Sequence, residues 1–145
     1  MHRELRASFN LIVDVPPEIG KLKRLRKLVL NGNRIRKLPN EVGRLEMLEE
    51  LIVSENALEE MPHSIATMSM LRVLKLQNND LRTIPFELVD VVTLEDLDFS
   101  GNPHLVMVPK LWQGDTESVL FVCKIHRGRS RAAAFTDIFL GTIVV

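Results

Sequence analysis

An asparagine recurs at a fixed interval along most of this chain of 145 residues. Successive asparagines of the series are 23 residues apart, at Asn10, Asn33, Asn56, Asn79 and Asn102. Proline follows an apolar residue with the same spacing, at Pro16, Pro39, Pro62 and Pro85. A fixed period of this length predicts a stack of structural repeats, because one such unit cannot bury its apolar face alone.

The apolar residues keep the same phase as the asparagines. One unit contains Leu25, Leu28, Leu30, Ile35, Leu38, Val42 and Leu45, and the next contains Leu48, Leu51, Val53, Leu58, Met61, Ile65 and Met68. The series continues towards the C-terminus, and a weaker first unit precedes it. We therefore predict one solenoid of five repeats over residues 1–114, at about 2–24, 25–47, 48–70, 71–93 and 94–114.

Within each unit the pattern predicts a strand, a turn and a convex segment. Leu28 and Leu30 alternate with Lys27, Val29 and Asn31, a period of two that is typical of a short strand with its leucines inward. Stacked strands of this kind form a parallel sheet. The asparagine amide then satisfies backbone groups that the turn leaves unpaired. Proline is tolerated in a first helical turn, so short helical turns are expected after each proline.

The repeat LxxLxLxxNxLxxLPxxIxxLxx, over roughly residues 2 to 126, resembles the leucine-rich-repeat family. Its Leu-Pro step is similar to that of the intracellular Ras-suppressor and Scribble-like members. The resemblance implies an α/β solenoid, a curved right-handed superhelix with a parallel β-sheet on the concave face and short helical turns or loops on the convex face. It also implies a capping helix over residues 115–127, with a strand as the alternative because residues 119–125 are β-rich. The tail at 128–145 matches nothing in the pattern and stays unassigned.

Charge and cysteine content indicate the cellular compartment and which classes of partner are not expected. The 19 basic residues balance the 19 acidic ones, so no overall field draws the chain to nucleic acid or to an anionic membrane. Cys123 has no second cysteine with which to form an internal disulfide, and no Asn-x-Ser/Thr acceptor occurs. The N-terminus lacks the apolar stretch of a secretory signal. We therefore expect a cytoplasmic protein with neither nucleic acid nor membrane as its partner.

The sequence contains no recognised catalytic motif, so we expect no enzyme activity and no cofactor. Neither a Gly-x-Ser-x-Gly elbow, a His-Glu-x-x-His helix nor a phosphate loop is present. Cys123 and His126 have the spacing of half a zinc site, but a second pair at ligand spacing is missing. Asp96 and Asp98 lie two residues apart on one strand face, which favours ligand-facing charge over paired catalytic carboxylates.

The outward residues of the predicted strands are the candidate partner-binding site, because the resemblance implies binding on the concave face. These residues are Arg6, Lys27, Val29, Asn31, Glu50, Ile52, Ser54, Val73, Lys75, Gln77, Asp96 and Asp98. Adjacent strands lie about 4.8 Å apart, so Val29, Ile52 and Val73 are expected to form one exposed apolar patch. Strand propensity alone is the alternative explanation for these β-branched residues. Arg6 and Lys27 at one end oppose Asp96 and Asp98 at the other, which would orient a partner.

Two functions are consistent with this pattern. The first is a protein-protein interaction module or scaffold, with a role in small-GTPase-type signalling implied by the resemblance alone. The alternative is the recognition segment of a larger enzyme or enzyme complex, such as a ligase, kinase or phosphatase. Only Met1 to Glu4 precede Leu5, too few residues to cover the apolar end of a solenoid, which predicts an exposed edge strand. Three explanations are consistent with such an edge: the chain is part of a longer array, it is a truncated product, or it self-associates through an interface that covers the edge.

Overall fold

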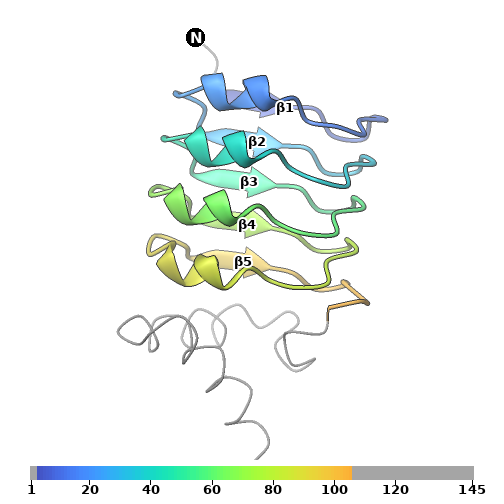
Figure 1. The fold of residues 1–145 in the computed structure, drawn as a ribbon. Coiled ribbons are helices and arrows are strands. Elements are labelled where there is room, and N and C mark those ends of the chain that lie inside the picture. Colours follow the sequence, from blue (N-terminus) through green and yellow to red (C-terminus); the bar gives the residue numbers. More distant parts are fainter. Residues whose placement is uncertain (1–2, 106–145) are drawn as a thin grey trace, which may run out of the picture.

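The computed structural model describes residues 3–105, which form a stack of coils around one apolar core. The strands are β1 (Glu4–Arg6), β2 (Lys27–Val29), β3 (Glu50–Ile52), β4 (Val73–Lys75) and β5 (Asp96–Asp98). Short 3-10 helices alternate with them: η1 (Pro17–Lys21), η2 (Asn40–Arg44), η3 (His63–Thr67) and η4 (Phe86–Asp90). The strands form one side of the stack and the helices the other (Figure 1).

All five strands belong to one parallel sheet with the order β1-β2-β3-β4-β5. Each residue pairs with the residue 23 positions later, so that Leu5, Leu28, Leu51, Leu74 and Leu97 form one row. Backbone bonding continues past the strand ends: the N–H of Leu30 donates to the carbonyl of Ile52 at 2.8 Å. The predicted leucine-rich solenoid with a parallel sheet is therefore confirmed.

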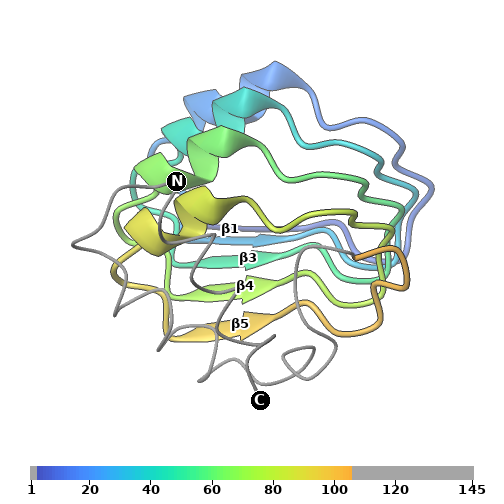
Figure 2. The same cartoon turned by 60° about the horizontal axis from the view of Figure 1, so that its bottom comes forward.

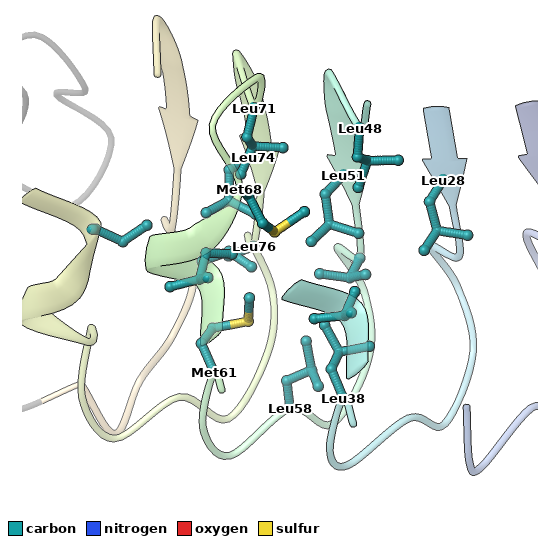
Figure 3. Close-up of a cluster of buried hydrophobic side chains, with 14 of the residues drawn as sticks. Leu28, Leu38, Leu48, Leu51, Leu58, Met61, Met68, Leu71, Leu74 and Leu76 are labelled. Carbon is teal, nitrogen blue, oxygen red and sulfur yellow. The ribbon is translucent and has the colours of Figure 1, made fainter. Parts of the chain in front are cut away.

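The core lies between the sheet and the helical side of the stack. Leu28, Leu51 and Leu74 are fully buried, and Figure 3 shows them beside leucines and methionines from the other segments of each coil. The apolar positions predicted for the second, third and fourth units are all buried. Burial is continuous from coil to coil, because each unit covers the apolar face of its neighbour.

The repeated asparagines join each turn to the coil before it. The side-chain oxygen of Asn79 accepts the N–H of Leu58 at 3.0 Å, and its amide nitrogen donates to the carbonyls of Val53 at 3.1 Å and Leu76 at 2.9 Å. Asn56 and Asn102 bond in the same way one coil earlier and later. The predicted role of these amides in satisfying turn backbone is confirmed.

The residue just before each of these asparagines has a left-handed backbone conformation, with φ between 53° and 69°, at Phe9, Gly32, Glu55, Asn78 and Gly101. Figure 2 shows the turns following the strands at one edge of the stack. Glycine adopts this conformation without a steric cost, whereas the bulky Phe9 adopts it under strain. The turn geometry is therefore imposed by the coil and its asparagine, since only two of the five positions are glycine.

The prolines cap the 3-10 helices instead of occupying their first turn. Pro16, Pro39, Pro62 and Pro85 are N-cap residues with extended ψ angles between 127° and 151°. The carbonyl of Pro39 accepts the N–H of Val42 at 3.0 Å, the first bond of η2. Among these helices only η1 has a proline, Pro17, inside its first turn. The expected helical turns are present, but each begins one residue after the repeated proline.

Close packing between helices predicts a strict size limit at Gly43. A Cβ at this position would lie 2.6 Å from both the Cβ and the carbonyl oxygen of Ser64 in η3. We expect Gly43→Ala to lower the free energy of unfolding by about 1–3 kcal/mol, because the backbone of η3 must shift. Urea unfolding followed by circular dichroism measures the loss. Asn40→Ala, at an exposed position of the same helix, is the control, and equal stability of the two variants would contradict the steric explanation.

Several predicted features lie outside the described residues. These are the capping helix at 115–127, the tail at 128–145, Cys123 and His126. The repeat boundaries also stay predictions, although the strands begin 23 residues apart. Within residues 3–105, no helix has the length and apolar character needed to cross a membrane.

Candidate partner-binding face

The outward side chains of the sheet and of the residues just after it form three columns, which we call the strand face. The first column is Glu4, Lys27, Glu50, Val73 and Asp96, and the second is Arg6, Val29, Ile52, Lys75 and Asp98. The third is Ser8, Asn31, Ser54, Gln77 and Ser100, which directly follow the backbone ladder. The structure therefore brings all of the sequence-predicted site residues onto one face.

The burial of individual residues on this face corrects the predicted apolar patch. Val29 is only 6% exposed and Ser54 only 4% exposed, whereas Ile52 and Val73 are half-buried. Val29 lies in register between Arg6 and Ile52, so neighbouring strands about 4.8 Å away present side chains on both sides of it. The prediction of an exposed Val29 is wrong, and the accessible apolar surface reduces to Ile52 and Val73.

Most charges of the strand face are paired within the face. Lys27 forms an ion pair with Glu50, and the Nζ of Lys75 lies 2.7 Å from the carboxylate of Asp96. On β1, the guanidinium of Arg6 lies 3.0 Å from the carboxylate of Glu4. The predicted charge gradient is therefore weaker than the sequence indicates, because opposite charges neutralise each other locally.

Asp98 differs from the other strand-face carboxylates. It accepts hydrogen bonds from the backbone N–H of Ser100 at 3.0 Å and from the Ser100 hydroxyl at 2.8 Å. None of the ion pairs within the described part of the chain includes Asp98. Among residues 3–105, Asp98 is thus a negative charge at the C-terminal end of the strand face that no Lys, Arg or His side chain pairs with.

Two polar residues of the third column bond to each other, whereas a third has an unsatisfied side-chain oxygen. The hydroxyl of Ser8 donates to the side-chain oxygen of Asn31 at 2.7 Å. The Oε1 atom of Gln77 is buried and has no hydrogen-bond partner within the described structure. A buried amide oxygen without a donor is unusual in proteins. Gln77 is therefore the polar group on this face that most needs a donor.

A charge ladder beside the strands was not anticipated from the sequence. Arg26 lies 2.8 Å from Glu49, and Arg72 lies 2.8 Å from Glu95, so the sign alternates along one column of consecutive coils. The hydrogen bond from Arg72 to Glu95, with the charges of Glu95 and Glu49, raises the pKa of Arg72. Exposed pairs contribute little to stability. The sequence could have indicated this ladder, because each ion pair joins residues of opposite charge that are 23 positions apart.

A separate hollow of about 510 Å³ lies beside the proline steps of the first three coils. Its lining includes Pro39, Pro62 and His63, and an ion pair of 3.2 Å between Lys37 and Glu60. None of its lining residues belongs to the strand face. In the region from Arg3 to Leu105, no three His, Cys, Asp or Glu side chains are grouped to hold a metal ion.

Comparison with known proteins decides the family. A model described as a leucine-rich repeat region matches residues 14–111, about two thirds of the chain. The chain belongs to the leucine-rich-repeat family. Leucine-rich repeats stack into solenoids whose extended sheet surfaces bind other proteins, so a protein-protein interaction module is the general function of this domain type. The Ras-suppressor or Scribble-like type stays a prediction.

Among solved structures, this leucine-rich-repeat chain is similar to a leucine-rich-repeat protein of Leptospira interrogans. The two share 30% sequence identity with a TM-score of 0.66, and the match covers 79% of this chain. It covers only 27% of the Leptospira chain, so the present leucine-rich repeats span about a quarter of that protein's length. The comparison with curated proteins gives no match.

Proposed function

We propose that this chain binds another protein on the strand face, as a non-enzymatic interaction module or scaffold. The observation that carries the proposal is the register of the sheet, which places outward side chains from five consecutive coils in continuous columns. A rigid scaffold that presents one broad row of side chains is suited to recognising a partner surface.

The centre of the proposed interface is the half-buried pair Ile52 and Val73. They lie on adjacent strands, in neighbouring columns, beside the Lys27–Glu50 and Lys75–Asp96 ion pairs. Charges that are already paired need less ordering when a partner binds, which lowers the entropic cost. The columns contain no aromatic residue, and aromatic side chains most often dominate tight interfaces. We therefore expect modest affinity.

Gln77 supports a partner with polar groups as well as an apolar contact. Its unsatisfied Oε1 atom lies in the third column, one coil after Ser54. Because this oxygen is buried, a partner reaches it only if the Gln77 side chain changes rotamer, and a donor from the partner would then remove the cost of leaving the oxygen unpaired. The polar neighbours around Ile52 and Val73 then act as the rim of the interface.

The test compares partner capture by variants with equal added charge. We expect Ile52→Glu with Val73→Glu to lose the partner in affinity capture with mass spectrometry, because carboxylates replace the central apolar contact. Asn40→Glu with Met70→Glu is the matched control at exposed positions away from the strand face, and it should keep the partner. Retention by both variants would place the binding site elsewhere. Val29→Asp is unsuitable, because its burial would confuse binding with unfolding.

We further propose a cytoplasmic location and a role in small-GTPase-type signalling. The single cysteine supports the location, whereas the signalling role is supported only by the similarity of the Leu-Pro repeat to intracellular members of the family. Identification of a small GTPase or its regulator among proteins captured by the wild type, and lost with Ile52→Glu and Val73→Glu, tests the signalling role. Fluorescent tagging tests the location.

A further inference from the structure

The extended segments between the turns and the 3-10 helices form a second surface of the stack, which Figure 2 shows layered coil upon coil. The N–H of Arg34 donates to the carbonyl of Ile12 at 2.9 Å, and the N–H of Asp80 donates to the carbonyl of Leu58 at 3.0 Å. We call the outward positions of these segments the lateral face: Phe9, Leu11, Val13; Gly32, Arg34, Arg36; Glu55, Ala57, Glu59; and Asn78, Asp80, Arg82.

The lateral face is apolar in the first coil and mostly polar or charged in the next three. Phe9 is 73% exposed, Leu11 is 71% exposed and Val13 is 48% exposed, and we call these three residues the apolar row. Arg34 and Arg36 have a coil on both sides and are exposed at the equivalent positions. The positions of the apolar row therefore face outward whichever segment adjoins the first coil. A contiguous exposed row of this kind is typical of contact with another molecule.

Phe9 occupies this face in a strained conformation. Its φ of 53° is left-handed, which is costly for a bulky side chain. The ring lies across the second coil, because a Cβ on Gly32 would be 2.4 Å from the ring atom Cδ1 of Phe9. Most of the ring stays exposed, so burial does little to offset the strain. Strain at an exposed aromatic residue favours a role in binding over a role in stability.

The charges beside the apolar row define the chemistry of its ligand. Arg34 and Arg36 are exposed, and neither forms an ion pair within residues 3–105. Glu55 and Glu59 reverse the sign in the third coil. A membrane or a nucleic acid presents one negative sign, so the third coil would repel it. A protein segment can place carboxylates on the arginines alone, and charge complementarity therefore favours a protein ligand.

The hollow beside the proline steps continues the apolar row. It begins at the residues that directly follow Val13 and Arg36, and its lining includes Val15, Leu38 and Met61. Its volume of about 510 Å³ is within the range of pockets that hold ligands. A segment that runs along the row can therefore insert one side chain there.

We infer that the lateral face binds an extended segment of a partner protein in which apolar and acidic residues alternate. Side chains of an extended chain project to opposite sides and recur every two residues. Along the seam between the first two coils, one side of the segment contacts the apolar row. The other side reaches Arg34 and Arg36, which are also two residues apart. This site is separate from the strand face.

A short labelled peptide of alternating leucine and glutamate, fused to a small carrier protein, tests the inference by fluorescence polarisation. We expect the wild type to bind it, and Leu11→Ser with Val13→Ser to bind about tenfold more weakly, because the apolar contact is lost. Met70→Ser with Val92→Ser, at exposed apolar positions of other coils, is the matched control and should bind like the wild type. Circular dichroism checks that the variants are folded.

Charge reversal tests the acidic half of the recognition. We expect Arg34→Glu with Arg36→Glu to bind the leucine-glutamate peptide about tenfold more weakly, because like charges then face each other. The same variant should bind a leucine-lysine peptide better than the wild type does. Arg44→Glu with Arg82→Glu, at exposed positions away from the seam, is the control and should keep the wild-type preference.

Phe9→Gly separates binding from stability. We expect it to weaken peptide binding about fivefold without lowering the urea midpoint, because glycine adopts the left-handed conformation freely. Four results would each overturn the inference: no binding by the wild type, equal binding of the two peptides, unchanged binding by any lateral-face variant, or loss of the peptide with Ile52→Glu and Val73→Glu. Binding to phosphatidylserine vesicles in place of the peptide would overturn it as well.

Discussion

Asn79→Ala is expected to lower the free energy of unfolding by about 3–4 kcal/mol, because it removes several buried hydrogen bonds at once. Asn79 is 3% exposed, and its amide joins the N–H of Leu58 to the carbonyls of Val53 and Leu76. Alanine leaves these backbone groups buried and without the amide that joins them. Urea unfolding monitored by circular dichroism measures the loss.

Asn10→Ala is the matched control for the asparagine series. Asn10 occupies the same repeat position, but it is exposed and donates only to Ala7 and Ser8 of its own turn. Solvent can satisfy those carbonyls after the substitution, so the expected loss is below about 1 kcal/mol. Similar losses for the two variants would show that the asparagine fixes a local turn and that its bonds between coils contribute nothing to stability.

Leu51→Ala is expected to cost about 3–5 kcal/mol, the range for a leucine deleted from a packed core. Leu51 is fully buried in the central strand β3, and it lies in the row that joins Leu28 to Leu74. The cavity cannot close easily, because the backbones of both neighbouring strands are fixed by the parallel ladder. Thermal and urea unfolding measure the effect.

The position of Leu51 in a stack adds a second expectation. Each coil of a solenoid contacts only its neighbours, so a cavity in the third coil weakens the coupling between the two ends. We therefore expect a broader urea transition with a smaller slope as well as a lower midpoint. Met70→Ala, at a side chain 40% exposed, is the control and should change neither quantity appreciably. An unchanged slope for Leu51→Ala would show that the stack unfolds as one unit.

Much of the architecture follows from the spacing of residue types. Because Asn33, Asn56 and Asn79 recur with the leucines in one phase, equal coils must stack and equivalent residues must pair in register. The membership of the columns on the strand face follows from the same period. A repeat determines which residues are neighbours along the stack, because each coil packs against the one before it.

Exposure and pairing on the strand face could not be obtained in this way. Val29 and Ile52 occupy equivalent positions of neighbouring coils, yet Val29 is buried and Ile52 is partly exposed. Lys75 pairs diagonally with Asp96, although its register partner is Asp98. Such differences depend on the length and rotamer of each surrounding side chain, which a pattern of residue types does not specify.

The 23-residue period was sufficient to predict the solenoid, the parallel sheet, the asparagine bonds between coils and the candidate face. The folded chain was needed to show which of those residues are accessible, that opposite charges such as Lys27 and Glu50 already neutralise each other, and that Phe9 has a left-handed backbone conformation. The physical reason is the range of the interactions. Periodic burial sets the backbone of every coil alike, whereas accessibility and charge pairing are set by contacts between individual side chains of different coils.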